Sequence, residues 1–559
     1  MAKYAIGLDF GTLSVRALLV NAETGEELKS VVYEYPHGSM ETNIPTGKKL
    51  PINWALQHPA DYEEGLVYVV KGVMKKNDVH PEEIIGIGVD FTSSTILPVL
   101  NDTTPLCYLP EFKDEPHAYV KLWKHHGAEE YAKEIERIAK ERGEKWLDLY
   151  GGKVSSEWML PKIMETAIEA PEVYDKADRF LEAMDWITWK LTGVETRSAC
   201  AAGYKMFYHH EHGYPDKAFL KALHPKLENL VEEKLDAPVK GIGECAGYLT
   251  EEWAEKLGLR PGIPVATAII DAHVNAAACG IDGPEKLLII IGTSSCHMLQ
   301  SKTVGATIEG IQGVVKDGMI PGFYGYEAGQ SCVGDQFAWF VDNCVPEAYA
   351  VEARENGMNL HQYLTEKCKR LKPGESGLIA LDWWNGVRSP LMDFNLTGMM
   401  VGMNLLTTPE EMYLALLEST AYGTRLIIEN FEKNGIPVKE IVMAGGIANK
   451  NPLLMQIYAD VCKKKITICG SDQSGAFGAA ILGIAAAGPE VTGYKDANEA
   501  IRKLGKVKDI EYIPNPENAA IYDKLYEEYK ILHSYFGRGE NEVMKRLLKI
   551  REEQRAKSH

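Results

Sequence analysis

Apolar residues occur along the chain in two kinds of run. Short runs of consecutive apolar residues predict buried β-strands, at residues 4–9, 15–20, 84–91, 264–270, 287–291, 377–381 and 439–443. Longer runs with helical spacing of apolar residues predict amphipathic helices, at residues 59–76, 115–140, 409–433, 451–463 and 474–487. The charged stretch 516–556 predicts a further helical segment that packs along the surface. Strands that alternate with helices predict an α/β fold whose sheets are covered by helices.

One of these patterns occurs twice. Residues 6–20 predict a strand, a tight Gly-Thr turn and a second strand, and residues 288–299 repeat this order. Two such hairpins, each near the start of a half of the 559-residue chain, predict two related domains that face each other across a cleft. The turn at Gly283-Pro284 places the boundary, so we expect domains at 1–283 and 284–559. The alternative is two unrelated hairpins, since Gly-Thr turns are common.

Charge and cysteine content narrow the classes of partner. The chain has 60 basic and 79 acidic residues, a formal net charge of −19, which disfavours binding to nucleic acid or to an anionic membrane. Its ten cysteines form no Cys-x-x-Cys pair, and no apolar run reaches the roughly 18 residues expected of a membrane-spanning helix. We therefore expect a cytoplasmic protein with reduced cysteines that acts on small molecules.

The two hairpin turns are candidate phosphate sites. A Gly-Thr turn directs backbone N–H groups and a hydroxyl toward one point, so it can bind an anion whatever the net charge of the protein. Two facing turns can hold the β- and γ-phosphates of ATP. Asp9 precedes the first turn, where its carboxylate can hold Mg²⁺ directly or through water. Arg16, on the returning strand, is either a phosphate contact or a structural ion-pair partner.

Two further motifs end predicted strands. Asp271 follows the strand 264–270, and the carboxyl end of a strand is where α/β folds bind their ligands. The alternative for Asp271 is an N-cap that satisfies helix N–H groups, and we expect His273 to be a structural neighbour. Gly445-Gly446 follows the strand 439–443, and two adjacent glycines leave room for a flat ring or a phosphate beside the backbone. A plain structural turn is the alternative there.

Taken in order, these motifs resemble those of the FGGY family of sugar kinases, which are two-domain relatives of actin, Hsp70 and hexokinase. Residues 398–418 resemble the C-terminal signature of that family, and the resemblance extends from residue 4 to about residue 490. It implies two ribonuclease H-like domains that flank a cleft for ATP and sugar. The N-terminal domain would supply the sugar and phosphate side, and the C-terminal domain the adenosine side together with a helical extension.

The resemblance also implies a role for each motif. Asp271 would be the general base and Asp9 would help to place Mg²⁺, with both carboxylates available to the metal through water. The ATP contacts would be Gly11, Thr12, Ser14, Gly292, Thr293, Ser294, Gly445, Gly446 and Asn449. The sugar contacts would be Thr92, Ser93, Trp123, Lys205, Asp271, Glu327 and Gln330. The alternatives are core packing for Trp123 and a solvated surface charge for Lys205.

Segments 88–95, 122–126, 202–205, 325–335 and 382–390 resemble those of family members that phosphorylate L-ribulose to L-ribulose 5-phosphate in L-arabinose catabolism. One departure is His125, which stands where many such members have an acid, at the expected rim of the sugar site. Another pentulose or a pentitol, such as D-ribulose, L-xylulose or ribitol, is an alternative substrate. An ATPase switch of the actin or Hsp70 type is the alternative from another class, and a homo-oligomer stays open.

Overall fold

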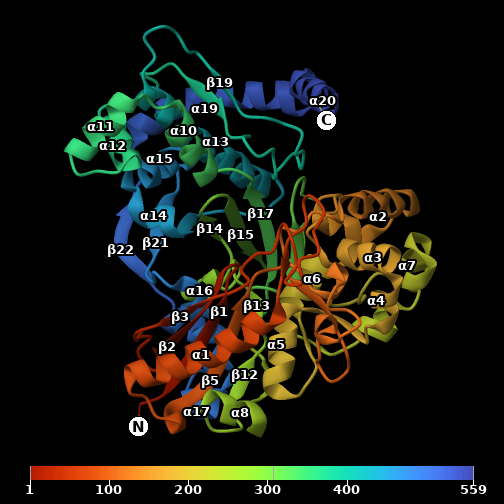
Figure 1. The fold of residues 1–559 in the computed structure, drawn as a ribbon. Helices are drawn as coiled ribbons and strands as arrows, with labels where there is room; N and C mark the ends of the chain where they lie inside the picture. Colours follow the sequence, from red (N-terminus) through yellow and green to blue (C-terminus); the bar gives the residue numbers. More distant parts are fainter. Residues whose placement is uncertain (1, 306–307, 558–559) are drawn as a thin grey trace.

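The computed structural model describes residues 2–305 and 308–557 of the chain. It has a lower and an upper lobe, with a helical arm beside the lower one (Figure 1). A seven-stranded sheet forms the lower lobe, in the order β11-β12-β5-β1-β2-β3, with β13 also paired to β5. Its strands are β1 (Tyr4–Phe10), β2 (Ser14–Asn21), β3 (Val31–Glu34), β5 (Ile84–Phe91), β11 (Cys245–Tyr248), β12 (Pro264–Ala266) and β13 (Ile269–Ile270).

A second seven-stranded sheet forms the upper lobe, in the order β16-β17-β15-β14-β20-β21-β22. Its strands are β14 (Lys286–Ile291), β15 (Ser295–Ser301), β16 (Gly313–Lys316), β17 (Tyr324–Gln330), β20 (Glu440–Ala444), β21 (Lys465–Cys469) and β22 (Val507–Tyr512). Helices α10 (Gly334–Cys344), α11 (Glu347–Glu355), α12 (Leu360–Cys368), α13 (Pro409–Lys433), α14 (Gly446–Lys450) and α15 (Pro452–Cys462) complete this lobe with the short pair β18 (Ile379–Leu381) and β19 (Met399–Val401).

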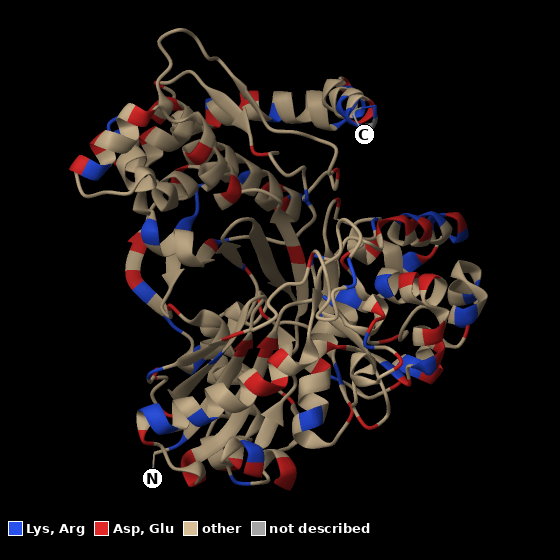
Figure 2. Ribbon diagram, in the orientation of Figure 1, with Lys and Arg blue, Asp and Glu red and all other residues tan. Residues whose placement is uncertain are grey.

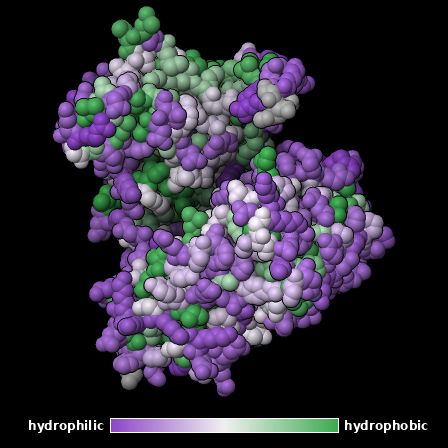
Figure 3. Space-filling model, in the orientation of Figure 1, coloured by the Kyte–Doolittle hydropathy of each residue, from purple (hydrophilic) through white to green (hydrophobic). Residues whose placement is uncertain are grey.

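The repeated hairpin is confirmed in the pairing of the strands. β1 pairs antiparallel with β2 and parallel with β5, and β14 pairs antiparallel with β15 and parallel with β20. Each sheet is therefore built around one hairpin and one parallel neighbour. The two hairpins therefore lie in different lobes, and Figure 3 shows a hollow between these lobes.

Helix α16 (Ser474–Ala486) belongs to the C-terminal part of the chain but packs on the lower sheet against β1 and β5. Glycines in those strands allow this contact, because a Cβ at Gly7 would lie 1.8 Å from the Ala476 carbonyl oxygen and one at Gly88 1.7 Å from that of Ala479. Helix α18 (Ala497–Leu504) joins the same core. The lower lobe thus includes residues from both sides of position 283, and the division at 283/284 stays a prediction.

The helical arm is an insertion between β5 and β11 with a hydrophobic core of its own. A four-stranded sheet, β4-β7-β6-β8, joins the arm to the lower lobe. Its strands are β4 (Leu56–Gln57), β6 (Ile96–Val99), β7 (Val120–Lys121) and β8 (Arg179–Glu182). The helices of this half are α1 (Pro59–Asn77), α2 (Glu129–Arg142), α3 (Met159–Glu169), α4 (Pro171–Lys176), α5 (Ala183–Thr192), α6 (Ala199–Met206), α7 (Lys217–Leu223), α8 (Glu251–Leu257) and α9 (Asn275–Ala278).

Three predictions of elements were wrong in part. The helix predicted at 115–140 begins only at Glu129, because residues 120–121 pair as β7 with β4 and β6. The strand predicted at 264–270 is interrupted after Ala266 and divides into β12 and β13. The segment 516–556 forms α19 (Pro516–Gly537) and α20 (Val543–Ala556), and α19 buries three tyrosines in the upper core rather than only covering the surface.

The backbone positions of basic and acidic residues are interspersed over the two lobes and the arm (Figure 2). Among the described residues, no single helix has the length and apolar composition to cross a membrane. One bent pair of helices, Ser474–Ala486 with Pro489–Leu504, has this length and composition only when the two helices are taken together.

Candidate active site

Three neighbouring strands bring three aspartates to one edge of the lower sheet. Asp9 in β1 pairs in register with Asp90 in β5, and Asp271 follows β13, where its N–H donates to the Phe91 carbonyl at 2.8 Å. Both Asp9 and Asp271 were predicted as site residues. Asp90 was not predicted, because the signal it gives in the sequence is only an acid near the end of an otherwise apolar strand.

The electrostatics of these carboxyls reflect burial and mutual repulsion. Burial, followed by the charge of Asp9, raises the pKa of Asp271 to about 7. Burial also raises the pKa of Asp90 well above its usual range, and the nearby Asp9 and Asp271 raise it further. Among the described residues, the carboxyl of Asp90 has no hydrogen-bond partner from outside this group of acids, and a proton on it can be shared with Asp9. Acids clustered in this way suit a hard divalent cation, which takes oxygen ligands.

Each hairpin turn closes with a hydrogen bond from its glycine, over three residues in the first turn and two in the second. The Gly11 N–H donates to the Ser14 carbonyl and the Gly292 N–H to the Ser294 carbonyl, each at 2.9 Å. In the first turn the Thr12 hydroxyl also accepts from the indole Nε1 of Trp123 at 3.1 Å. The first turn is thereby tied to the segment that carries the predicted sugar contact Trp123.

Lys205 and Glu327 join the two halves of the chain. Lys205 Nζ, from α6, lies 3.4 Å from Glu327 Oε2 on β17, and His273 Nε2 lies 3.4 Å from the same oxygen. Burial alone would raise the pKa of Glu327, but Lys205 and His273 lower it to about 2. Lys205 is 6% exposed, so the alternative of a solvated surface lysine is wrong. The glutamate is thus a buried anion that can accept hydrogen bonds.

The loop that carries Thr92 and Ser93 connects β5 to β6. The hydroxyl oxygens of Thr92 and Thr95 lie 2.8 Å apart, and both side chains are buried. Ser94 between them has φ 52°, a left-handed conformation that is uncommon for a residue with a side chain. The polar groups of this loop therefore have a fixed local geometry.

Gln330 does not join the predicted sugar contacts. Its Nε2 donates to Asp382 Oδ2 at 2.8 Å and to the Thr420 carbonyl at 2.9 Å. Its Oε1 accepts from the hydroxyls of Thr424 at 2.8 Å and Ser295 at 3.1 Å. The amide has no donor or acceptor left for a sugar, so in this structure Gln330 connects segments of the upper lobe.

The Gly445-Gly446 turn lies beside the second hairpin, between β20 and α14. Gly445 has φ 100°, and a Cβ there would lie 2.4 Å from the Ile291 carbonyl oxygen. Gly446 differs, because a Cβ there would meet no atom within 4 Å. Asn449 Oδ1, one turn further on, accepts from Lys508 Nζ at 2.8 Å. Gly445 therefore shapes the turn, and Gly446 leaves open space next to it.

His125 is not at the rim of the sugar site. It is fully buried in the arm, and its Nε2 lies 3.0 Å from Glu165 Oε2. Lys121 Nζ reaches the same carboxylate oxygen at 2.5 Å. Burial lowers the pKa of His125 to about 4 despite this acid. The departure at position 125 is thus accommodated by a neutral imidazole beside the carboxylate of the buried Lys121–Glu165 ion pair.

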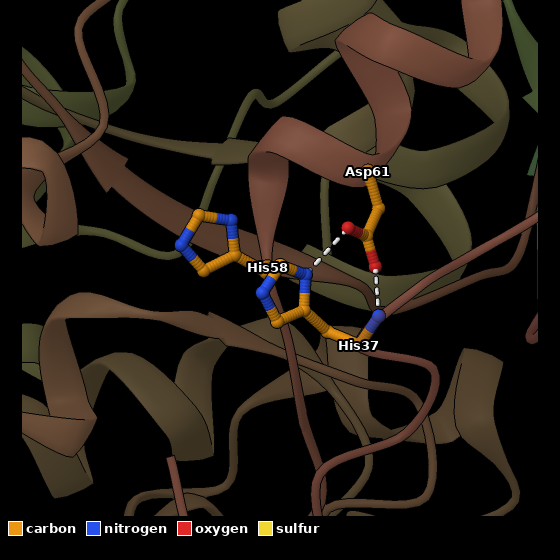
Figure 4. Close-up of side chains that lie close together, drawn as sticks. All are labelled: His37, His58 and Asp61. Atoms are coloured by element: carbon orange, nitrogen blue, oxygen red, sulfur yellow. Dashed lines mark hydrogen bonds and ion pairs between the residues drawn. The ribbon is translucent and has the colours of Figure 1, made fainter. Parts of the chain in front are cut away.

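A second group of possible metal ligands lies at the start of α1: His37, His58 and Asp61 (Figure 4). These side chains are already partnered, since His37 Nδ1 lies 2.6 Å from Asp61 Oδ1 and His58 Nδ1 accepts from the Ala60 N–H. The two imidazole rings are stacked, with centroids 4.5 Å apart and planes 20° apart. His58 caps the N-terminus of α1, and the carboxylate of Asp61 is bonded to the ring and the N–H of His37.

Matches to known families place the chain clearly. Residues 4–279 match the N-terminal domain, and residues 287–487 the C-terminal domain, of the FGGY family of carbohydrate kinases. The chain belongs to this family. It is 53% identical over 540 residues to the ribulokinase of Bacillus licheniformis, covering 96% of this chain and 98% of that one. It is 51% identical over 556 residues to the ribulokinase of Geobacillus thermodenitrificans, covering 99% and 98%.

Solved structures confirm the predicted fold class. The structure resembles a ligand-bound xylulose kinase from Lactobacillus acidophilus with a TM-score of 0.78 and 20% identity, covering 96% of this chain and 99% of that chain. It also resembles the structure of a Plasmodium falciparum glycerol kinase with ADP. The TM-score is 0.74 and the identity 16%, over 96% of this chain and 98% of that chain. The fold is the two-domain α/β arrangement of the actin and hexokinase type.

Proposed function

We propose that this carbohydrate kinase transfers the γ-phosphoryl group of ATP to L-ribulose and releases ADP and L-ribulose 5-phosphate. The observation that supports this substrate most strongly is the set of ribulokinases that are 50–53% identical to the chain over at least 96% of its length. The site supports the reaction class, because Asp271, an acid with a raised pKa, follows a strand of the sheet that also carries the first candidate phosphate turn.

Asp271 is the proposed general base. A base works best when its pKa lies near the working pH, and the pKa of Asp271 is raised to about 7. Ionised Asp271 would take the proton from the attacking sugar hydroxyl as the oxygen bonds to the γ-phosphorus and the bond to the ADP oxygen breaks. The first turn (Gly11, Thr12, Ser14) and the second (Gly292, Thr293, Ser294) would hold the phosphates from opposite lobes.

The proposed metal ligands are Asp9 and Asp271, directly or through water, joined by Asp90. A bound Mg²⁺ would supply positive charge to the phosphates. The place of Asp90 within this group of acids supports the addition of this residue. On the adenosine side, the open space at Gly446 supports a nucleotide that lies against the Gly445-Gly446 turn and Asn449.

The proposed sugar contacts are Thr92, Ser93, Trp123, Lys205 and Glu327. A polyol needs both donors and acceptors, and Lys205 and Glu327 supply one of each from opposite halves of the chain. We propose that sugar binding between them closes the two lobes, which correspond to the predicted domains 1–283 and 284–559 except that α16 and α18 pack in the lower lobe. Gln330 would hold the end of β17 through its bonds to Asp382 and the Thr420 carbonyl rather than touch the sugar.

The test is ADP release with each of the four 2-ketopentoses, with ribitol and with no sugar. We expect L-ribulose to give the highest kcat/KM. Faster turnover of D-ribulose, L-xylulose or ribitol would reassign the substrate within the class. ADP release that no sugar stimulates would instead favour an ATPase switch of the actin or Hsp70 type.

A further inference from the structure

A fully buried lysine lies behind the proposed sugar site. Lys162 is in the first turns of α3 and is 0% exposed. Its Nζ donates to two backbone carbonyls from different segments, Ser94 at 2.6 Å and Leu122 at 2.7 Å. One ammonium group therefore joins two stretches of chain that lie 28 residues apart in sequence.

Both stretches carry proposed sugar contacts. Ser94 follows Thr92 and Ser93, and it holds a left-handed φ of 52°. Leu122 precedes Trp123, whose indole N–H donates to the Thr12 hydroxyl of the first phosphate turn. Lys162 is thus the first member of a chain of contacts that runs from the sugar loop through Trp123 to the phosphate turn.

An apolar helix residue would be the ordinary occupant of such a position. Burying an ammonium group is costly, whereas a methionine of similar length would carry no such cost. Methionine would, however, remove this donor from both carbonyls: Leu122 would keep the hydrogen bond from the His125 N–H, but Ser94 would lose its donor, and an unsatisfied buried carbonyl is itself unfavourable. The lysine therefore exchanges some stability for a fixed distance between the two carbonyls.

A second buried group acts on the same loop. Glu182, at the end of β8, accepts from the Thr95 N–H at 3.0 Å and is also buried. The loop is thus bonded on its carbonyl side by Lys162 and on its amide side by Glu182. These contacts account for a left-handed serine in a loop that has no glycine between residues 92 and 95.

We propose that Lys162 is a positioning residue that sets the distance between the 92–95 loop and Trp123, and thereby aligns the sugar hydroxyl with the γ-phosphate held at the first turn. The proposal rests on the proposed function for its substrate. Its structural part, that Lys162 orders the two segments, holds whatever the substrate is. The two parts can therefore be measured separately.

The test compares Lys162→Met with Lys234→Met. Lys234 is the matched control, because it is also buried and its Nζ donates to one backbone carbonyl, that of Ala177 at 2.5 Å, which carries no proposed substrate contact. Both variants are expected to lose thermal stability. Only Lys162→Met is expected to speed amide hydrogen exchange in peptides that cover residues 92–99 and 120–126 of the ligand-free protein.

The kinetic measurements give KM for L-ribulose, KM for ATP and the amount of sugar phosphate formed per ADP released. In Lys162→Met we expect KM for L-ribulose to rise about tenfold, the effect of about 1.4 kcal/mol, while KM for ATP stays within about twofold. We also expect less sugar phosphate per ADP released, because a misplaced hydroxyl lets water compete. A purely structural lysine would lower stability without changing this ratio, as we expect for Lys234→Met.

The outcomes separate the two claims. Unchanged exchange in both peptides of a folded Lys162→Met protein would overturn the positioning role, whether or not L-ribulose is a substrate. Faster exchange in a protein whose wild type does not phosphorylate L-ribulose would support the positioning role and contradict the proposed function. If Lys162→Met does not fold, Lys162→Gln keeps a shorter donor; normal exchange and normal coupling in that variant would overturn the proposal.

Discussion

Asp271 is the single residue on which the proposed proton transfer depends. Its Oδ1 accepts from the Ala272 N–H at 2.7 Å, a contact that the amide oxygen of asparagine can keep. Asp271→Asn should therefore fold and bind ATP, measured by calorimetry, yet lose about 10²–10⁴-fold in turnover as the loss of a general base predicts. Turnover near that of the wild type would remove Asp271 from the mechanism.

The raised pKa of Asp271 also predicts how stability depends on pH. A carboxyl whose pKa is about 7 when folded, against about 3.9 when unfolded, holds its proton more tightly in the native state, so the native state loses stability relative to the unfolded state as the pH rises from about 4 to about 7. The stability that the neutral form provides is thus present at low pH and is lost as the pH rises through about 7.

Asp271→Asn has no such ionisation. Without Mg²⁺ or nucleotide, its melting temperature should exceed that of the wild type most clearly at pH 8, and the difference should shrink toward pH 5. Wild-type kcat/KM should fall as the pH drops below about 7, because the base becomes protonated. A gap in melting temperature that does not vary with pH would show that Asp271 titrates normally.

The proposed adenosine site depends on the Gly445-Gly446 turn between β20 and α14. Gly446 begins α14, and a Cβ at this position would meet open space, whereas Gly445 has φ 100° and lies against the Ile291 carbonyl. We expect Gly446→Val to fold, seen by circular dichroism, and to raise KM for ATP about tenfold while KM for sugar changes less than about twofold. Gly445→Val is the contrasting variant and should be destabilised. Equal increases in both KM values for Gly446→Val would make the turn purely structural.

Local patterns explain which elements could be predicted. The helix predicted at 409–433 matches α13, and both hairpins form where the Gly-Thr turns predict them, because helical spacing and turn residues act over a few neighbouring positions. Gln330 could not be assigned from sequence, since its four hydrogen-bond partners come from separate segments. Lys162 was missed because its carbonyl partners, at Ser94 and Leu122, lie in separate segments, although apolar neighbours such as Leu160 and Ile163 do signal a buried helix.

The placement of α16 was also beyond local reasoning. Its apolar, small-residue composition predicts a buried helix, but only tertiary packing against Gly7 and Gly88 assigns it to the lower lobe. The N-terminal end of this helix comes close to the site, since a Cβ at Gly475 would lie 3.2 Å from Asp9 Cγ. An element from the C-terminal part of the chain therefore shapes the surroundings of the N-terminal carboxylates.

We expect the two lobes of the whole molecule to close when both substrates bind. The two proposed phosphate turns belong to different lobes. Two contacts join the N-terminal half of the chain to β17 of the upper lobe, from Lys205 to Glu327 and from the Tyr204 hydroxyl to the Gly325 carbonyl. Sugar and nucleotide bound together should favour a closed form, because only a closed form lets both turns reach the γ-phosphate.

Small-angle scattering should then give a smaller radius of gyration with L-ribulose plus a non-hydrolysable ATP analogue than with the analogue alone. An unchanged radius, with both ligands shown to be bound, would mean that the cleft is preformed.

Phosphorus NMR of the complete reaction distinguishes transfer of the γ-phosphoryl group to a sugar from its transfer to water. With ATP, Mg²⁺ and L-ribulose, we expect one new phosphomonoester signal that grows in step with ADP, and almost no such signal with Asp271→Asn. Growth of inorganic phosphate instead, at a rate that L-ribulose does not change, would show that the protein is not an L-ribulose kinase.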